Sequence, residues 1–376
     1  MHNKIDRQKQ NIAKKYFLSK FYISKINTLV SLIFGLLIIF TGISAGLSIW
    51  SKNISSVRII YTAIYFLALF TLFYIISIPF SYINSFKTEH KYNFSNQSLK
   101  EWVIDSIKSY SVSLILGLIV MNTIYFIIVN SPDFWWFWLG IALLFYSVIL
   151  QHLAPVLLIP IFYKLHPLED EDLKQKLYNL AEKAKVKIIG IYTIDLSQKT
   201  KKANAALTGL GKTRRILLGD TLIDDYDKGE IETVIAHELG HHIHKHIPKL
   251  ILIQGSFTMI SAFILFKLLP GILNYLNQGS VSNINSFPVL VITAGFISFF
   301  TNPINLWISR VFESQSDDTA LKLSQKPKKF ISTMCKFANQ YLSYANPPKI
   351  IKLFEFSHPP ISERIQKAEE FESANK

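Results

Sequence analysis

Cysteine is almost absent from the sequence, with Cys335 as the single example among 376 residues. A disulfide within the chain is therefore excluded, which fits a protein whose soluble parts face a reducing compartment. Internal repeats and low-complexity tracts are also lacking, so a repeat architecture is not expected. Charged residues make up only 18% of the chain, and long stretches contain none. This uneven distribution of charge is unusual for a single soluble domain.

Six apolar segments are long enough to cross a bilayer, whose hydrocarbon core of about 30 Å needs about 20 apolar residues. The alternative is a large soluble protein with six buried helices, but such helices show a polar face and these segments mostly do not. The first segment is also too long for a cleavable signal peptide, so we expect none. The segments are Leu29 to Trp50, Ile59 to Ile83, Val112 to Val129, Phe134 to Tyr163, Ile251 to Phe266 with its flanks, and Phe287 to Ile308.

The distribution of basic residues predicts the orientation of these spans. Lysine and arginine are frequent before the first span, in residues 84–111 and in the two large segments 164–250 and 309–376, whereas residues 131–133 and 270–286 have none. Because basic loops stay on the cytoplasmic side, we expect six spans with both termini inside. The formal net charge of +14 is therefore a topology signal, and nucleic-acid binding is not expected.

A capping-box pattern predicts a helix at the end of the first soluble segment. Asp227 is followed three residues later by Glu230, and apolar residues then recur at helical spacing. We expect this helix to run from about Lys228 to Ile247, with Pro248 ending it at the membrane surface. Ahead of it, KIIGIYTIDL and RRILLGD are rich in β-branched residues and predict two short strands.

The expected helix contains HELGHHIHKH, ten residues with five histidines and one glutamate. Residues four apart lie on one face of a helix, so His237 and His241 can bind one ion, with Glu238 beside it as a general base. This is the H-E-x-x-H pattern of zinc sites. A catalytic zinc needs a third protein ligand, and Glu313 after the sixth span is the best candidate. Asp317, four residues on, could hydrogen-bond a ligating histidine, although such an acidic pair alone is usually a solvated helix face.

The sequence leaves the roles of three further histidines open. His242 and His244 fit positions at the headgroup boundary or pairs with acids. His152 lies inside the fourth apolar run, where it is either functional or part of a hydrogen bond between helices.

Three motifs together resemble the type I CAAX prenyl proteases and their relatives, which are integral-membrane zinc peptidases. HELGHHIHKH, SRVFESQSDDTA and FSHPPISERI occur in the order found in that family, and the resemblance covers most of residues 79–365. It implies one zinc ion held by His237, His241 and Glu313, with Asp317 as a companion that contacts the ligands.

The resemblance implies further roles that spacing does not show. His358 would donate a hydrogen bond to the oxyanion of the reaction, and Asn204 and Ala205 would lie at the substrate-binding strand. His246 matches a further histidine of the family. The sequence departs from the family at His242, where a bulky aromatic residue is usual, in NAAL, where larger side chains are frequent, and in its six spans, where eukaryotic members have seven.

These observations predict a mainly α-helical, polytopic membrane protein with six to seven transmembrane helices and a zincin-like metalloprotease domain that contains a small β-sheet. We expect four spans in residues 1–163, the first part of the protease domain in 164–250, two spans in 251–308 and the second part, with the third ligand, in 309–376.

The predicted function is zinc-dependent hydrolysis of peptide bonds, with the active site facing the cytoplasm from a bacterial inner membrane or the endoplasmic reticulum. The substrate is either a prenylated peptide that loses its last three residues, or a membrane protein degraded in quality control. The lipid bilayer is the other expected partner. The alternative is a non-enzymatic transporter or metal-binding scaffold with a vestigial site, which the intact Glu238 argues against.

Overall fold

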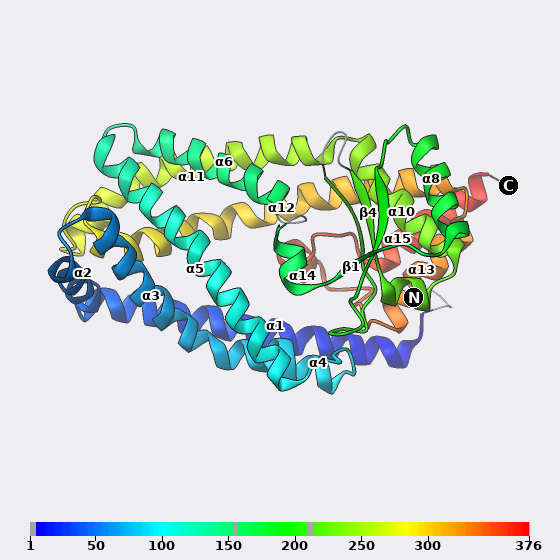
Figure 1. Ribbon diagram of the computed structural model, residues 1–376, viewed down its shortest axis with the longest axis horizontal. Coiled ribbons are helices and arrows are strands. Elements are labelled where there is room, and N and C mark those ends of the chain that lie inside the picture. Colours follow the sequence, from blue (N-terminus) through cyan, green and yellow to red (C-terminus); the bar gives the residue numbers. More distant parts are fainter. Residues whose placement is uncertain (1–4, 154–156, 210–213, 376) are drawn as a thin grey trace.

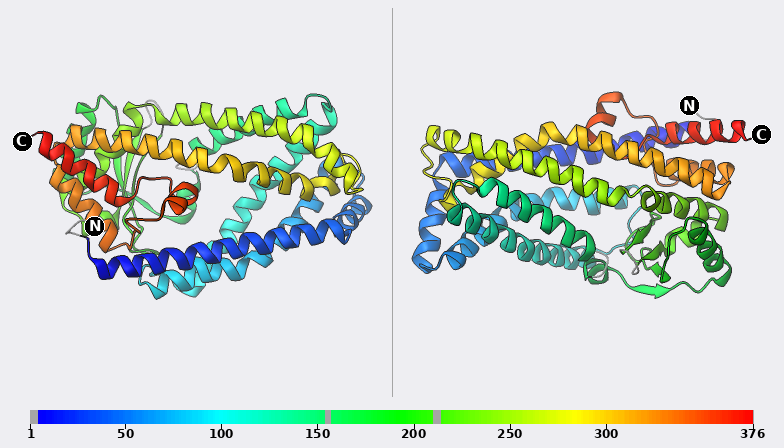
Figure 2. Two further views of the ribbon diagram at one scale, coloured as in Figure 1. Left: turned by 180° about the vertical axis from the view of Figure 1, so that it is seen from behind. Right: turned by 90° about the horizontal axis from the view of Figure 1, so that it is seen from above.

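The computed structural model describes residues 5–153, 157–209 and 214–375. The molecule is elongated, with long helices along its length and a small β-sheet at one end (Figure 1). The first and last described residues lie at the end of the molecule that carries the sheet, and α2 (Ile43–Ile54) lies at the opposite end. The views from behind and from above show the same division into a helical part and a sheet-containing part (Figure 2).

Five helices of the described chain are long and apolar enough to cross a membrane, and α6 (Trp135–Leu153) is a shorter apolar helix. Large apolar side chains remain exposed along them, as expected where lipid is the neighbour. The second long helix continues past its α-helical part through a π-helical turn, Tyr82–Lys87, and α4 (Thr88–Lys91). The five are α1 (Arg7–Phe40), α3 (Arg58–Ser81) with this continuation, α5 (Leu99–Asn130), α11 (His246–Tyr275) and α12 (Phe287–Ser324).

The boundaries expected for the first span are wrong. Helix α1 begins at Arg7, where the side chain of Asp6 accepts hydrogen bonds from the first turn, and it ends at Phe40. Gly42 then takes a φ of 75°, a left-handed conformation that glycine adopts without steric cost, and α2 follows. The expected segment Leu29 to Trp50 therefore belongs to two helices joined by a turn.

The helix predicted from Lys228 to Ile247 also ends earlier than expected. Helix α10 runs from Lys228 to Ile243, and Lys245, with a φ of 53°, separates it from α11. Pro248 lies in the first turn of α11, where a missing N–H costs no helical hydrogen bond. The proline therefore belongs to the start of the next helix and does not end the previous one.

A four-stranded mixed sheet forms the centre of the sheet-containing part. Its order is β1 (Leu165–Pro167), β2 (Gly190–Ile194), β4 (Arg215–Gly219) and β3 (Ala205–Thr208). Strands β2 and β4 are parallel, and the other two neighbouring pairs are antiparallel. The small sheet is thus confirmed, with β2 and β4 in the two stretches predicted as strands. Among the described strands β3 pairs with β4 alone, so one of its sides is a free edge.

Helices pack around this sheet and bury an apolar core. Leu177 of α8, Leu218 of β4, Ile231 of α10 and Phe330 of α13 belong to one buried cluster. Full burial of each such side chain contributes about 1.5–3 kcal/mol, and together these contacts fix α10 against the sheet. The helices of this part, besides α10, are α8 (Glu171–Lys183), α9 (Asp220–Asp225), α13 (Pro327–Asn339), α14 (Lys349–Glu355) and α15 (Ile361–Ala374), with a short α7 (Ile159–Phe162) before β1.

Candidate active site

Helix α10 carries most of the candidate site and has a well-defined start. The Asp227 carboxylate accepts the Glu230 N–H at 3.0 Å, and the Glu230 carboxylate accepts the Asp227 N–H at 3.0 Å. This is the predicted capping box. The buried Glu230 carboxylate also pairs with Lys336 of α13 at 2.7 Å. The first turn of α10 is therefore held both by its own cap and by a neighbouring helix.

Further along, α10 packs directly against α12. Gly240 makes this approach possible, because a Cβ atom at this position would lie 3.0 Å from the Ser316 Cα and 3.1 Å from the Thr319 Cβ. Any larger residue would push the helices apart. The HELGH segment consequently lies against the backbone of α12.

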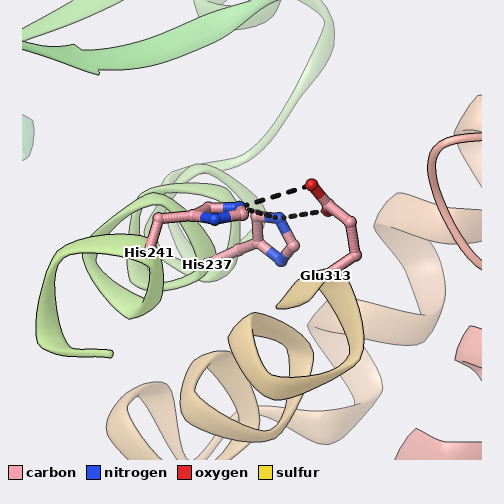
Figure 3. A group of neighbouring side chains, drawn as sticks. All are labelled: His237, His241 and Glu313. Carbon is pink, nitrogen blue, oxygen red and sulfur yellow. Dashed lines mark hydrogen bonds and ion pairs between the residues drawn. The ribbon is translucent and has the colours of Figure 1, made fainter. Parts of the chain in front are cut away.

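The three predicted ligands meet between these two helices (Figure 3). The Nε2 atoms of His237 and His241 lie 3.3 Å apart. Glu313 oxygens lie 3.1 Å from the first of these nitrogens and 3.5 Å from the second. One ligand atom from each of the three residues falls within 4.8 Å of the others, and two of the residues are buried while His241 is half-buried.

This set of donors fits a metal ion. Two nitrogens that each lie 2.0–2.1 Å from a tetrahedral zinc would stand roughly 3.3 Å apart. The Nδ1 atom of His237 donates to Asp317 at 2.9 Å. In the neutral imidazole this leaves a lone pair on Nε2 that is directed at Glu313. Within the described chain, the buried Oε2 of Glu313 has no hydrogen-bond partner. Lone pairs that face one another in this way are stabilised by a cation between them.

The two histidines differ in their electrostatics. Burial opposes the charged form of His237, but its contacts with the carboxylates of Asp317 and Glu313 outweigh burial and raise its pKa to about 9. Burial and the nearby charge of His237 lower the pKa of His241 to about 4. His241 is therefore neutral and ready to act as a ligand, whereas a metal must displace a proton from His237.

Asp317 fixes the orientation of His237 and is itself fixed by Arg364. The buried Asp317 carboxylate accepts Arg364 Nε at 2.9 Å and a terminal guanidinium N–H at 2.6 Å, a bidentate pair. The sequence indicated Asp317 but missed Arg364. The arginine lies in FSHPPISERI, and its contact joins residues 47 positions apart, so no local spacing reveals it.

Glu238 lies beside the ligands and lines a pocket of about 180 Å³. Asn204, Ala205, His237 and His358 line the same pocket, so the predicted catalytic and substrate-contacting residues surround one space. Burial raises the pKa of Glu238 above its ordinary value. A carboxylate with a raised pKa suits proton transfer near neutral pH.

His358 reaches the site from the loop before α15. Its Nε2 lies 3.3 Å from the Glu313 Oε2, and its Nδ1 lies 2.9 Å from the Ser357 hydroxyl. The side chain is 56% exposed although Glu313 is buried. An exposed imidazole next to the ligands can donate a hydrogen bond to a bound substrate.

His246 is fully buried and lies beside His241, the second proposed ligand. Its Nδ1 lies 3.0 Å from the Nδ1 of His241, and its Nε2 lies 2.9 Å from the Gln315 side-chain oxygen. The ring also stacks on Phe312 with centroids 4.4 Å apart. These contacts hold the ring of His241 in place.

His242 and His244 lie near the site but do not belong to the ligand cluster. His244 hydrogen-bonds Thr319 of α12 at 2.8 Å. Burial lowers the pKa of His242, whose ring hydrogen-bonds the backbone of Leu207 in β3. The side chain of His152 lies outside the described part of the chain.

The fold and the site together define a membrane metallopeptidase: a bundle of membrane helices with a histidine–glutamate cluster beside the free edge of a small sheet. The sequence model described as "Peptidase family M48" matches residues 167–372, and the one described as "CAAX prenyl protease N-terminal, five membrane helices" matches residues 1–164. The chain belongs to peptidase family M48. It is a multi-pass membrane protein that cleaves peptides or proteins. The two family matches give no support to a non-enzymatic scaffold.

Individual relatives match almost the whole chain. A CAAX prenyl protease 1 homolog from Arabidopsis thaliana is 29% identical over 384 residues, which cover 96% of this chain and 88% of that protein. The uncharacterized metalloprotease YhfN from Bacillus subtilis is 25% identical, covering 96% of this chain and 86% of that one. The crystal structure of S. mikatae Ste24p covers 98% of this chain and 90% of its own, with a TM-score of 0.87 and 23% identity, and shows the same fold.

Proposed function

We propose that this chain is a zinc peptidase whose ion is held by His237, His241 and Glu313. The observation that carries the proposal is the convergence of their ligand atoms within 4.8 Å, at a pocket that also contains Glu238. Two histidines and a glutamate leave a fourth position open, as in catalytic zinc sites. Zinc bound there would polarise the scissile carbonyl and lower the pKa of water.

The protein groups supply proton transfer and orientation. Glu238 takes a proton from the attacking water and passes it to the leaving amine. His358 donates to the oxyanion, a contact typically worth about 3 kcal/mol of transition-state stabilisation. Asp317 keeps the proton of His237 on Nδ1, and Arg364 keeps Asp317 in place.

The free edge of β3 is the proposed binding surface for the peptide. Asn204 and Ala205, where this strand begins, line the pocket that contains Glu238. A peptide that adds to the edge as another strand gains backbone hydrogen bonds with little preference for sequence. The strand would then place a peptide bond beside the ligand cluster.

Prenylated peptides are the substrate class that we propose first, with the active site on the cytoplasmic side. The name of the Arabidopsis thaliana relative, a CAAX prenyl protease 1 homolog, supports the substrate. The many basic residues of segments 164–250 and 309–376 support the orientation. The Bacillus subtilis relative is named only as a metalloprotease, and for this reason broad cleavage of membrane proteins is the second candidate.

Two matched peptides test this proposal. The detergent-purified chain is given a peptide with a C-terminal CAAX sequence, farnesylated on its cysteine in one sample and unmodified in the other, with chelator-treated protein as the blank. We expect faster release of the last three residues from the farnesylated peptide. Equal cleavage of both contradicts the prenyl specificity and favours broad proteolysis, and no metal-dependent cleavage of either contradicts the peptidase assignment for such peptides.

A further inference from the structure

A second and larger cavity adjoins the active-site pocket. Its volume is about 680 Å³, compared with about 180 Å³ for the pocket that contains Glu238. Ala203, Phe337, His358 and Arg364 line both spaces, which are therefore neighbours with a shared wall. Most of the rest of the larger cavity is lined by α1 and by the loops on either side of α14, with many aromatic side chains: Tyr16, Phe17, Phe21, Tyr341, Tyr344 and Phe356.

Two lysines on the wall of this cavity share a single carboxylate. Lys20 of α1 and Lys202, just before β3, both pair with Glu89, and the Lys202 contact is 2.7 Å. The Tyr16 hydroxyl accepts from Lys202 at 2.6 Å and donates to Glu89 at 2.6 Å. Of the acids that the structure describes, Glu89 is the one within ion-pair distance of either ammonium group. The cluster therefore has a surplus of one positive charge.

The other ionised side chains of the lining have counter-ions of their own. Glu355 pairs with Lys25 at 2.6 Å, and Arg364 pairs with Asp317 at 2.6 Å. The surplus charge is thus local to the lysine pair, and both lysine side chains remain 34% exposed. A wall of this kind attracts an anionic group into a cavity that is rich in aromatic side chains.

The place of the lysines in the chain indicates which anion they face. A peptide can lie along the free edge of β3 in either direction, and Lys202 precedes the start of this strand at Ala205 by three residues. Positive charge at that end favours the direction that brings the carboxyl end of the peptide there, antiparallel to β3. Three residues of extended chain span about 10 Å. A C-terminus at the lysines therefore leaves a bond a few residues earlier beside Glu238.

We propose that Lys20 and Lys202 bind the free C-terminal carboxylate of the substrate and so direct cleavage to a bond close to the chain end. The aromatic lining receives the side chains of the departing residues. This inference rests on the proposed peptidase function. It adds which residues select the peptide bond that is cleaved. A chain that continues through the cavity has no carboxylate to offer the lysines.

The test uses the detergent-purified full chain and one peptide sequence in two forms, with a free C-terminal carboxylate and with a C-terminal amide. We expect kcat/KM to be roughly tenfold or more higher for the carboxylate form, because hydrogen bonds between charged groups are stronger than those to a neutral amide. Lys202→Met and Lys20→Met should each reduce this ratio, whereas Lys202→Arg, which keeps the charge, should retain most of it. Lys328→Met is the matched control, since Lys328 is 81% exposed and lies outside the cavity lining.

The outcomes separate this inference from the function on which it rests. Equal cleavage of both forms by the wild type overturns the inference and leaves the peptidase function intact. A preference for the carboxylate that survives in both methionine variants also overturns it. Size-exclusion chromatography would show whether Lys202→Met misfolds. In that case the inference is still tested by the carboxylate-to-amide ratio of kcat/KM in the wild type and in Lys20→Met. If the wild type cleaves neither form with zinc bound, the proposed function fails and the inference fails with it.

Discussion

Asp317 holds two cationic groups at once, the imidazole of His237 and the guanidinium of Arg364. A buried carboxylate is stable only when its charge is paired and its oxygens accept hydrogen bonds, and both conditions are met here. The pair with Arg364 fixes the carboxylate, and the carboxylate then fixes which nitrogen of His237 carries the proton. The orientation of His237, the first proposed ligand, thus depends on Arg364, which contacts Asp317 and none of the proposed ligands.

Replacing Asp317 should therefore weaken metal binding without removing a ligand. We expect Asp317→Asn to raise the Kd for zinc about 10–100-fold, the usual effect of losing such an outer partner of a metal ligand. The measurement is zinc competition against a chelator in the purified protein. Asp318→Asn is the matched control, because Asp318 is half exposed and pairs with Lys367 at 2.9 Å away from the ligands. An equal Kd in the two variants would contradict the positioning role.

The pH dependence of zinc affinity distinguishes a positioning role of Asp317 from a merely structural one. The pKa of His237 is raised to about 9 by its acidic partners. Below that pH, zinc must displace a proton, so the apparent Kd should rise about tenfold for each pH unit lowered. In Asp317→Asn, the partner that favours the charged ring is lost, and the onset of this rise should move to lower pH. An onset that stays unchanged would show that Asp317 does not act through His237.

The residues of the proposed metal site could be predicted from the sequence to different degrees. His237 and His241 could be predicted, because the geometry of a helix alone places residues four apart on one face. Glu313 was indicated by its position after a membrane span, and its identity as the third member of the cluster depends on how α10 meets α12. Arg364 could not be found, because its pairing with Asp317 is a tertiary contact with no local spacing to mark it.

At the scale of elements, the site depends on how closely α10 approaches α12. Two of the proposed ligands lie on the first helix and the third lies on the second, so the separation of the helices sets the size of the metal site. Gly240 is the contact point, with the backbone of Ser316 opposite. Metal affinity should therefore be more sensitive than the fold to small changes in the separation of α10 and α12.

Gly240→Ala tests this dependence directly. The added methyl group would lie 3.0 Å from the Ser316 Cα, so the helices must shift, at a cost of about 1–3 kcal/mol in stability. We expect a lower melting temperature and a weaker zinc affinity, measured by thermal unfolding and chelator competition. Gly271→Ala in α11 is the matched control, because no described residue comes within 4 Å of a Cβ atom there. Unchanged zinc affinity in Gly240→Ala would show that the spacing of the helices does not set the site.

The elements that the sequence predicted best are those with local signals. The capping box fixed the start of α10, and the density of β-branched residues marked β2 and β4. The ends of helices were harder to predict from the sequence. The apolar run from Leu29 to Trp50 contains no charged residue on either side of Gly42, and Pro248 is equally compatible with the end of one helix and the start of the next. Only the backbone conformations at Gly42 and Lys245 distinguish these possibilities.

At the scale of the whole molecule, the membrane and sheet-containing parts are joined by more than the linear order of the chain. Helix α1 extends from the sheet-containing end to the far end of the molecule (Figure 1). Near its start, Gln10 is buried, donates to the Ala338 carbonyl at 3.0 Å and accepts the Ala345 N–H at 2.9 Å. The sequence showed only a basic segment before the first span, since these partners lie more than 300 residues away. Helix α12 joins the two parts as well, because it carries both an apolar span and Glu313.

The most direct test of the central claim compares Glu238→Gln with Glu232→Gln in the purified full chain. Both replacements lie on α10, and Glu232 pairs with Lys326 outside the ligand cluster. Zinc content and kcat for peptide cleavage are measured on the same samples. We predict one zinc per chain in both variants, with kcat reduced about 10²–10⁴-fold in Glu238→Gln alone, because only this variant loses the general base. Wild-type turnover in zinc-loaded Glu238→Gln would contradict the proposed mechanism.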